Sequence, residues 1–245
     1  MKQPVAALIA VLISLGMLQP GRAATANSSL SLADDTFDPA NWSITIAWEL
    51  YPGTSSAAFR NYLGGGNPGA FAGVSLHSTA PNAVAVIRQG WIYDPATQGE
   101  ILSISSSADL RLVRYSGLDG FVPYRPLILQ NGNFFYSIWA MGVTSLSWTP
   151  YAFDNNLITS DRFIGVGNAS SLRPDFSANG APIQFGFMVD HGTRLTPVEF
   201  ELGMDNWRMT ITAVPEPQSA TIALVTLAAF GLRDRFRRPV QSESA

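Results

Sequence analysis

Residues 42–50 read Trp-Ser-Ile-Thr-Ile-Ala-Trp-Glu-Leu, in which large apolar side chains alternate with small or polar ones. Successive side chains of a β-strand point to opposite faces of the sheet. The pattern therefore predicts a strand that buries one face and exposes the other, as antiparallel sheets do. The buried face would carry Trp42, Ile44, Ile46, Trp48 and Leu50.

Nine further runs of this kind predict strands at 83–93, 100–105, 109–115, 127–130, 134–140, 145–149, 183–189, 198–202 and 207–213. Turn residues separate them, and Asn131-Gly132 is a strong hairpin signal. About ten short strands in fewer than 200 residues predict an all-β fold, an antiparallel two-sheet β-sandwich of the jelly-roll kind. We expect residues 64–69 and 154–174 to form loops.

The composition excludes several classes of protein. Only 13% of the 245 residues are charged, about half the usual share of about 25%. The absence of cysteine excludes disulfides, thiolate metal sites and cysteine nucleophiles. A net charge of −3, with Lys2 as the only lysine, argues against nucleic acid as a partner. His77 and His191 lie beside predicted loops, and we expect each to be a plain surface or turn residue.

The N-terminus has the three parts of a secretory signal peptide. Lys2 precedes an apolar run over residues 4–18, and small residues end at Ala23 and Ala26. The run is shorter than the ~20 residues of a membrane-spanning helix. We expect export through the secretion translocon, with removal of residues 1–26.

The C-terminus combines a proline motif, an apolar run over 219–232 and an arginine cluster. The motif and the cluster consist of Val214, Pro215, Glu216, Pro217, Arg233, Arg235, Arg237 and Arg238. The prolines predict that the last strand ends before them. The apolar run predicts a transmembrane helix of marginal length, with the arginines on the cytoplasmic side. The exported chain would then be anchored transiently in the membrane.

These three parts in this order resemble the PEP-CTERM sorting signal over residues 214–245. The resemblance implies a Gram-negative bacterium that makes exopolysaccharide. It further implies an exosortase, a membrane protease that removes the tail near Pro-Glu-Pro. The protein is then expected to be secreted or held at the cell surface, and the signal says nothing about the chemistry of residues 27–213.

The domain between the two signals, residues 27–213, loosely resembles concanavalin and laminin-G jelly rolls. The residues that carry this resemblance are 37–42, 174–180, 183–187 and 204–212. Such jelly rolls often hold calcium where the first and last strands meet. The oxygen-rich candidates here are Asp34, Asp35, Asp38, Asp205 and Asn206, and the alternative is that the aspartates form Asx-turns.

Two further patterns are candidates for carbohydrate chemistry. Trp148 and Tyr151 at a strand end predict a platform that stacks on sugar rings. Glu199 and Glu201 would share a strand face about 7 Å apart, a spacing that fits the two carboxylates of a glycosidase. The surrounding sequence lacks the Glu-x-Asp-x-x-Glu order of lectin-like glucanases.

The sequence therefore favours a non-enzymatic surface or matrix protein associated with exopolysaccharide in biofilm, with no required cofactor. The first alternative is a carbohydrate-binding module with a structural calcium. The second is a glycoside hydrolase.

Overall fold

The computed structural model describes residues 27–117, 120–153, 158–192 and 195–214. The predicted signal peptide and nearly all of the predicted sorting signal lie outside these residues. Among the residues it describes, no helix is long and apolar enough to cross a membrane.

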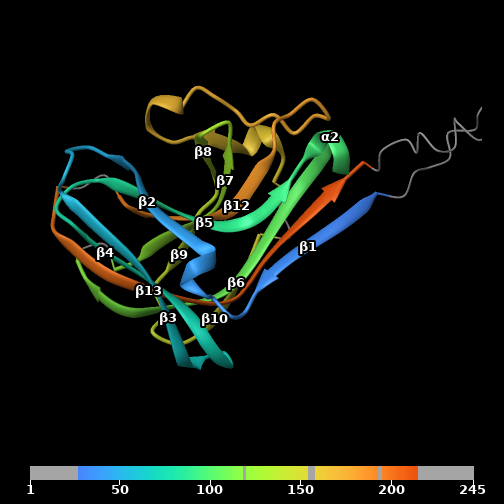
Figure 1. The fold of residues 1–245 in the computed structure, drawn as a ribbon. Helices are drawn as coiled ribbons and strands as arrows, with labels where there is room; N and C mark the ends of the chain where they lie inside the picture. Colours follow the sequence, from blue (N-terminus) through green and yellow to red (C-terminus); the bar gives the residue numbers. More distant parts are fainter. Residues whose placement is uncertain (1–26, 118–119, 154–157, 193–194, 215–245) are drawn as a thin grey trace, which may run out of the picture. The chain divides into compact units, whose positions relative to one another are not determined.

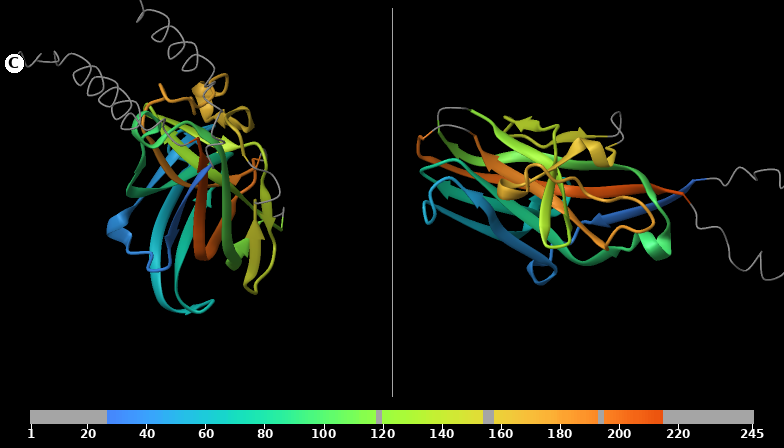
Figure 2. Two further views of the ribbon diagram at one scale, coloured as in Figure 1. Left: turned by 90° about the vertical axis from the view of Figure 1, so that its right-hand side faces the viewer. Right: turned by 90° about the horizontal axis from the view of Figure 1, so that it is seen from above.

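The described chain is an antiparallel sandwich of two sheets, which confirms the predicted fold class (Figures 1 and 2). Sheet A has the order β10-β6-β13-β4-β3, and β1 also pairs with β13; sheet B has the order β11-β8-β7-β12-β5-β2, and β9 also pairs with β7. The strands of sheet A are β1 (Ser28–Asp34), β3 (Ser55–Gly66), β4 (Gly69–Ser78), β6 (Ile101–Ser116), β10 (Thr149–Ala152) and β13 (Val198–Ala213). The strands of sheet B are β2 (Trp42–Glu49), β5 (Asn82–Tyr93), β7 (Val122–Gln130), β8 (Asn133–Ser137), β9 (Met141–Val143), β11 (Phe163–Gly165) and β12 (Ile183–His191). Four short helices complete the described elements: η1 (Pro39–Asn41), α2 (Pro95–Gln98), η2 (Ser160–Arg162) and η3 (Gly167–Ala169).

In two places, two predicted strands form one long strand in the structure. The predicted 100–105 and 109–115 form the 16-residue β6, and 198–202 and 207–213 form the 16-residue β13. A register shift between Asp205 and Arg208 interrupts the alternation in β13. A bulge interrupts the alternation of apolar and polar residues without ending the strand. The sequence pattern therefore predicted two strands where there is one.

The sequence pattern missed β1, β3 and β4, which are rich in serine, alanine and glycine. Such strands carry few large apolar side chains and so give a weak alternating signal. The expected loop at 64–69 is the tip of the β3–β4 hairpin. The predicted strand at 145–149 was wrong, since β10 begins only at Thr149.

The strand β2 departs from its own regular pattern at one point. Ile46 pairs with Val84 while Trp48 pairs with Ala83, so Ala47 is an extra residue, a β-bulge. Val84 faces the core between the sheets, whereas Ala83 belongs to an apolar cluster on the outer face of sheet B. The prediction that Trp48 shares the buried face of Trp42 was therefore wrong, because a bulge shifts the alternation by one residue.

Aromatic rings fill the core between the two sheets. The ring of Trp207, from β13, lies 5.2 Å from that of Trp42 in an edge-to-face arrangement and 5.7 Å from that of Trp91 in a stacked one. Trp42 also stacks on Phe59 at 5.5 Å. These rings come from both sheets, so their packing fixes how sheet A lies on sheet B.

A buried carboxylate joins the two sheets beside these rings. Asp34 ends β1 of sheet A, and its Oδ2 accepts hydrogen bonds from Arg88 Nε at 2.7 Å and Trp42 Nε1 at 3.1 Å, both from sheet B. Its Oδ1 accepts from the backbone N–H groups of Thr36 and Phe37. Burial acts to raise the pKa of Asp34, but these donors and the Arg88 charge outweigh it and hold the pKa below 3.8.

We predict that Asp34→Ala lowers the free energy of unfolding by about 3–5 kcal/mol, since it leaves Arg88 buried without its carboxylate. Asp35→Ala is the matched control, because Asp35 is the exposed neighbour. Denaturant unfolding of both variants measures the difference. The Asp34 contribution is complete above its unfolded pKa and is lost as the pH falls through its lowered folded pKa. Equal destabilisation by the two variants would contradict this role.

Candidate functional site

A cavity of about 480 Å³ lies on the outer face of sheet B. This volume is within the usual range of small-ligand pockets, about 300–1,000 Å³. Strands β2, β5, β12, β7 and β8 supply its floor, and the segment around η3 supplies one side. The residues that line it include Trp48, Ala83, Arg125, Tyr136, Val166, Met188, Asp190 and His191.

Two aromatic side chains line this cavity. Trp48 comes from β2 and Tyr136 from β8, which are four strand positions apart in sheet B. At a spacing of about 4.8 Å per strand, these two strands are about 19 Å apart. Trp48 is 38% exposed, which is unusual for a tryptophan in a sandwich strand. The cavity thus carries aromatic side chains from strands on either side of β7 and β12, which supply its charged residues.

Gly167 holds one wall of the cavity against Trp48. Its φ of +60° lies in the left-handed region that favours glycine. A Cβ at this position would lie 2.9 Å from Cδ1 of Trp48. A side chain here would therefore push the η3 segment away from the indole ring and open the cavity on that side.

An ion pair lies between the two rings. Arg125 Nε donates to Asp190 Oδ2 at 3.2 Å, and Arg125 Nη1 donates to the carbonyls of Ser137 and Ile138. The guanidinium lies 5.3 Å from the centroid of the Tyr136 ring. Within the described part of the chain, Arg125 Nη2 and Asp190 Oδ1 make no hydrogen bond. The pair is therefore fixed in place and keeps donors and an acceptor for a ligand.

Burial sets the titration of Asp190. Desolvation raises its pKa above the ordinary 3.8, and the Arg125 charge and hydrogen bond offset this only in part. Next to it, His191 is buried, and its Nε2 lies 3.0 Å from the carbonyl oxygen of Thr196. The expectation that His191 is a plain surface or turn residue was wrong, since it is a buried residue of β12, whereas His77 is exposed as expected.

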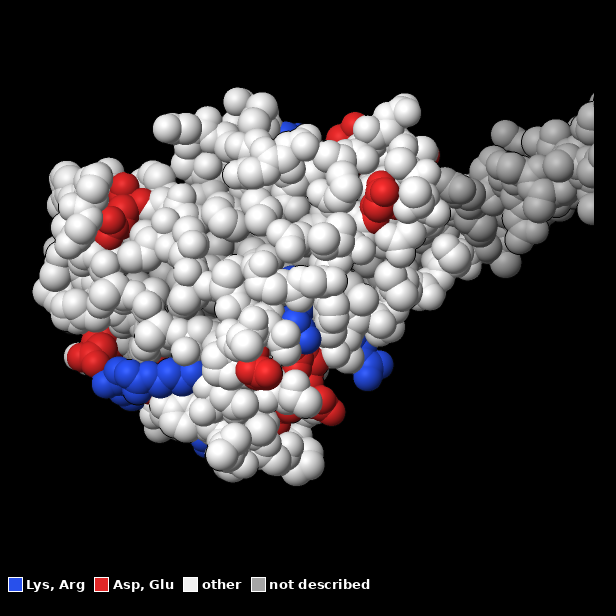
Figure 3. All heavy atoms as spheres, viewed as in Figure 1, with Lys and Arg blue, Asp and Glu red and all other residues white. Residues whose placement is uncertain are grey.

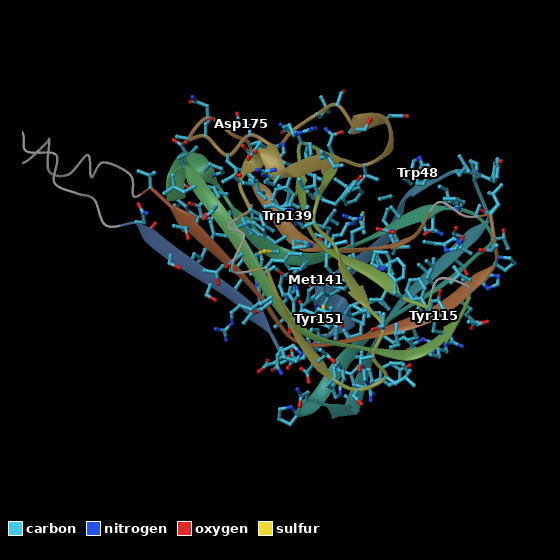
Figure 4. The ribbon with its side chains drawn as sticks, turned by 180° about the vertical axis from the view of Figure 1, so that it is seen from behind. Trp48, Tyr115, Trp139, Met141, Tyr151 and Asp175 are labelled. Carbon is cyan, nitrogen blue, oxygen red and sulfur yellow. The ribbon has the colours of Figure 1, made fainter. Side chains whose placement is uncertain are left out.

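The structure separates the predicted Trp148–Tyr151 platform. Tyr151 packs against the core, as do Trp139 and Met141, and lies far from Trp48 (Figure 4). Trp148 lies on the outer face of sheet A, where its Nε1 donates to the Gly65 carbonyl at 3.0 Å. The Arg111 guanidinium, 4.6 Å from its ring centroid, covers the indole.

The predicted calcium ligands lie in separate networks. Asp34 is engaged by Arg88, and Asp38 is exposed and caps η1 through the N–H of Ala40, as an Asx-turn would. Asp205 and Asn206 instead hold the β3–β4 hairpin tip: Asp205 accepts from the backbone N–H of Asn67, and Asn206 Nδ2 donates to the Asn67 carbonyl and to Asp109 Oδ2.

Asp35 is exposed, and none of these networks involves it. Among the described residues, no three His, Asp or Glu side chains gather as metal ligands. Calcium stays a prediction from the sequence.

The predicted carboxylate pair Glu199 and Glu201 does share one face of β13, on the outer side of sheet A. Arg114 binds both, with Nη1 at 2.7 Å from Glu199 Oε1 and Nε at 3.4 Å from Glu201 Oε2. Tyr62 also donates its hydroxyl to Glu201 and raises its own pKa in doing so. These contacts place the pair in a structural charge network on the sheet opposite the cavity.

Charged groups are sparse on the face of the molecule that Figure 3 shows, as the low charged share of the sequence leads one to expect. The cavity therefore stands out by its single ion pair between two rings rather than by a field of charge. Sequence reasoning missed Arg125, Tyr136 and Asp190, because each is an isolated residue within a strand and only the sheet order brings them together.

No family model matches this chain, and no curated protein matches it. Among solved structures, it is similar to a family 11 carbohydrate-binding module from Clostridium thermocellum in complex with a β-1,3-1,4-mixed-linked tetrasaccharide, at 14% identity and a TM-score of 0.43, over 78% of this chain and 99% of that one. It is also similar to a carbohydrate-binding module with specific mannan recognition, at 15% identity and a TM-score of 0.34, over 75% and 98%. An exo-β-agarase matches at 16% identity and a TM-score of 0.38, over 76% of this chain and 26% of its own. With TM-scores below 0.5, none of these likenesses assigns a ligand to this chain.

We predict that Arg125→Gln raises the pKa of Asp190 further above 3.8, because desolvation then acts without the opposing positive charge. NMR titration of the Asp190 carboxyl group measures the shift. Arg162→Gln is the control, since Arg162 pairs with Asp161 at an exposed site away from the cavity lining. An unchanged Asp190 titration in Arg125→Gln would show that the ion pair does not form in solution.

Proposed function

We propose that this chain is an exported, non-catalytic protein of the cell surface or extracellular matrix that binds polysaccharide through the cavity on sheet B. The observation that carries the proposal is the arrangement of Trp48, Arg125–Asp190 and Tyr136 along one cavity. The alternative to a binding site is a surface hollow that binds no ligand, and the binding experiment below distinguishes the two.

The chemistry of the cavity suits a neutral sugar chain. A pyranose ring presents apolar C–H groups on its faces and hydroxyl groups around its edge. Aromatic rings can pack against such faces, while hydroxyl groups both donate and accept hydrogen bonds. Arg125 offers donors and Asp190 an acceptor side by side, which matches two neighbouring hydroxyl groups on one ring. The net charge of the pair is zero, so it favours neutral over strongly charged sugars.

Export and sorting form the second part of the proposal. All thirteen described strands lie within residues 28–213, so the domain keeps every one of them when both terminal segments are removed. The last strand ends at Ala213, where the prolines that follow are expected to stop it. This end point supports a processing site just beyond the domain, recognised by an exosortase in a Gram-negative cell. The helix predicted at 219–232 would anchor the chain in the membrane only until that cleavage.

The absence of catalysis is also a proposal. The only carboxylates singled out for hydrolysis, Glu199 and Glu201, both bind Arg114. Glycoside hydrolysis needs two carboxyl groups that flank the scissile bond, whereas the shared arginine already occupies an oxygen of each carboxylate here. Hydrolysis of a bound glycan that is lost in Glu199→Gln or Glu201→Gln would overturn this view.

We predict that Trp48→Ala weakens binding to the preferred glycan at least tenfold, about 1.4 kcal/mol, because the cavity loses one of its two aromatic rings. A glycan array identifies the ligand, and titration calorimetry measures the affinity. The matched control is Trp148→Ala, which removes a tryptophan from the outer face of sheet A and should leave the affinity unchanged. Equal losses in the two variants, or no binding to any glycan by the parent protein, would refute the cavity as the site.

We predict that mass spectrometry of the secreted protein shows a chain that ends near Pro215, because exosortase cleavage removes the tail. In a cell that expresses an exosortase, Pro217→Ala in the Pro-Glu-Pro motif should retain the tail and the membrane anchor. Glu243→Ala, at the far end of the tail, should be processed normally. Secreted parent protein that still carries Ala245 would contradict the sorting prediction.

A further inference from the structure

Strand β1 is an edge strand with a regular, unprotected border. It pairs with β13 through seven consecutive residues, from Ser28 opposite Ala213 to Asp34 opposite Trp207, without a register shift. Within the described residues it has no partner on its other side, and Figure 1 shows it at the border of the sheet. It contains no proline and no charge before Asp34. A flat, uncharged strand edge is a template for pairing with another strand.

The other described edge strands carry the usual protection against such pairing. The edge strand β10 contains Pro150, and β3 carries the charged Arg60 and a register shift after Tyr62. In sheet B, β2 has the bulge at Ala47, while β9 and β11 have only three residues each. Proline, charge, bulges and shortness are the devices that blunt an edge. Their absence from β1 alone therefore distinguishes this edge from the rest.

The sequence of β1 is also complementary to itself. In an antiparallel pair of two copies with full seven-residue overlap, Ser31 lies opposite Ser31 and Leu30 lies opposite Leu32 of the second copy. Leu30 and Leu32 pair with the buried residues Ile211 and Met209 of β13, so both are on the core-facing side. Leu30 is nevertheless 38% exposed, because nothing beyond β1 covers it. The second copy's Leu32 would cover it without changing the register within either copy.

We propose that the protein forms a twofold dimer through antiparallel pairing of β1 with β1 of a second copy, which joins the two A sheets into one. The contact uses the same surface on both partners, so it closes on itself and stops at two chains. The protected edges elsewhere prevent further growth by strand addition.

Pairing would give each particle two sheet B cavities. This consequence, unlike the dimer, rests on the proposed function. Two sites on one particle raise the apparent affinity for a repeating polysaccharide and allow one particle to hold two chains. A dimer without glycan binding would leave the pairing intact and refute only the carbohydrate proposal.

Light scattering after size-exclusion chromatography tests the dimer directly, without any glycan. We expect the parent protein to have twice the mass of one chain at micromolar concentration. In Leu30→Lys we expect at least tenfold weaker dimerisation, because the lysine would face the apolar Leu32 of the second copy. Leu102→Lys is the matched control, since Leu102 in β6 of the same sheet is 37% exposed and should dimerise normally. Thermal unfolding of both variants confirms that they are folded.

A thiol cross-link tests the register. The chain has no cysteine, so Ser31→Cys introduces a single thiol that lies one strand spacing, about 5 Å, from its twofold mate. A short bismaleimide should link it into a dimer. Thr210→Cys, on the neighbouring strand and the same face, would be three spacings or about 14 Å from its mate and should stay unlinked. A monomeric parent protein, or a dimer that persists unchanged in Leu30→Lys, would overturn the proposal.

Discussion

The contact between Asp34 and Arg88 is the constraint on which the rest of the sandwich depends. It places a carboxylate at the end of a sheet A strand against a guanidinium from sheet B, with Trp42 as a second donor. The same arginine lies 4.6 Å from the Trp91 ring, so the charge pair and the aromatic core form one unit. Apolar packing alone is not directional, so it does not determine how far one sheet is displaced along the other. The hydrogen-bonded pair of Asp34 and Arg88 is directional and determines this displacement.

The sequence predicted the fold class because its long strands alternate with a period of two, and β2 shows this most clearly. The same assumption of an unbroken period of two led to the wrong face for Trp48. One extra residue, Ala47, reverses the face of every residue after it, and no feature of a single sequence marks that bulge. Without the bulge, Trp48 would lie between the sheets, and the cavity would lack one of its two rings. The bulge at Ala47 therefore both explains the wrong prediction for Trp48 and brings this ring into the cavity.

The other misses have a common physical cause. Strands β1, β3 and β4 lie in sheet A with serine, glycine and alanine at many positions, so their burial comes from their neighbours rather than from their own bulk. The cavity residues Arg125, Tyr136 and Asp190 belong to three strands, and hydrogen-bond pairing alone makes them adjacent. The predicted calcium ligands lie in separate networks because the protein itself supplies partners for them. They are close in sequence or in strand order, but each carboxylate with a buried position already has donors from the protein.

Three departures from regular β-structure lie in the lining of the cavity or beside it. They are the bulge at Ala47, the left-handed Gly167 and the half-buried pair of Arg125 and Asp190. Each of the three lowers stability relative to a regular strand. The bulge loses a hydrogen bond of the ladder, the glycine loses more backbone entropy on folding, and the buried carboxylate loses its hydration. Proteins concentrate such costs where a site needs them. Register shifts also occur in β13 and β3 of sheet A, so an irregular strand does not by itself mark a site. The departures around the cavity differ because they bring an aromatic ring, a wall and an ion pair into one hollow. This combination, more than the size of the cavity, is the physical reason to propose a binding site on sheet B.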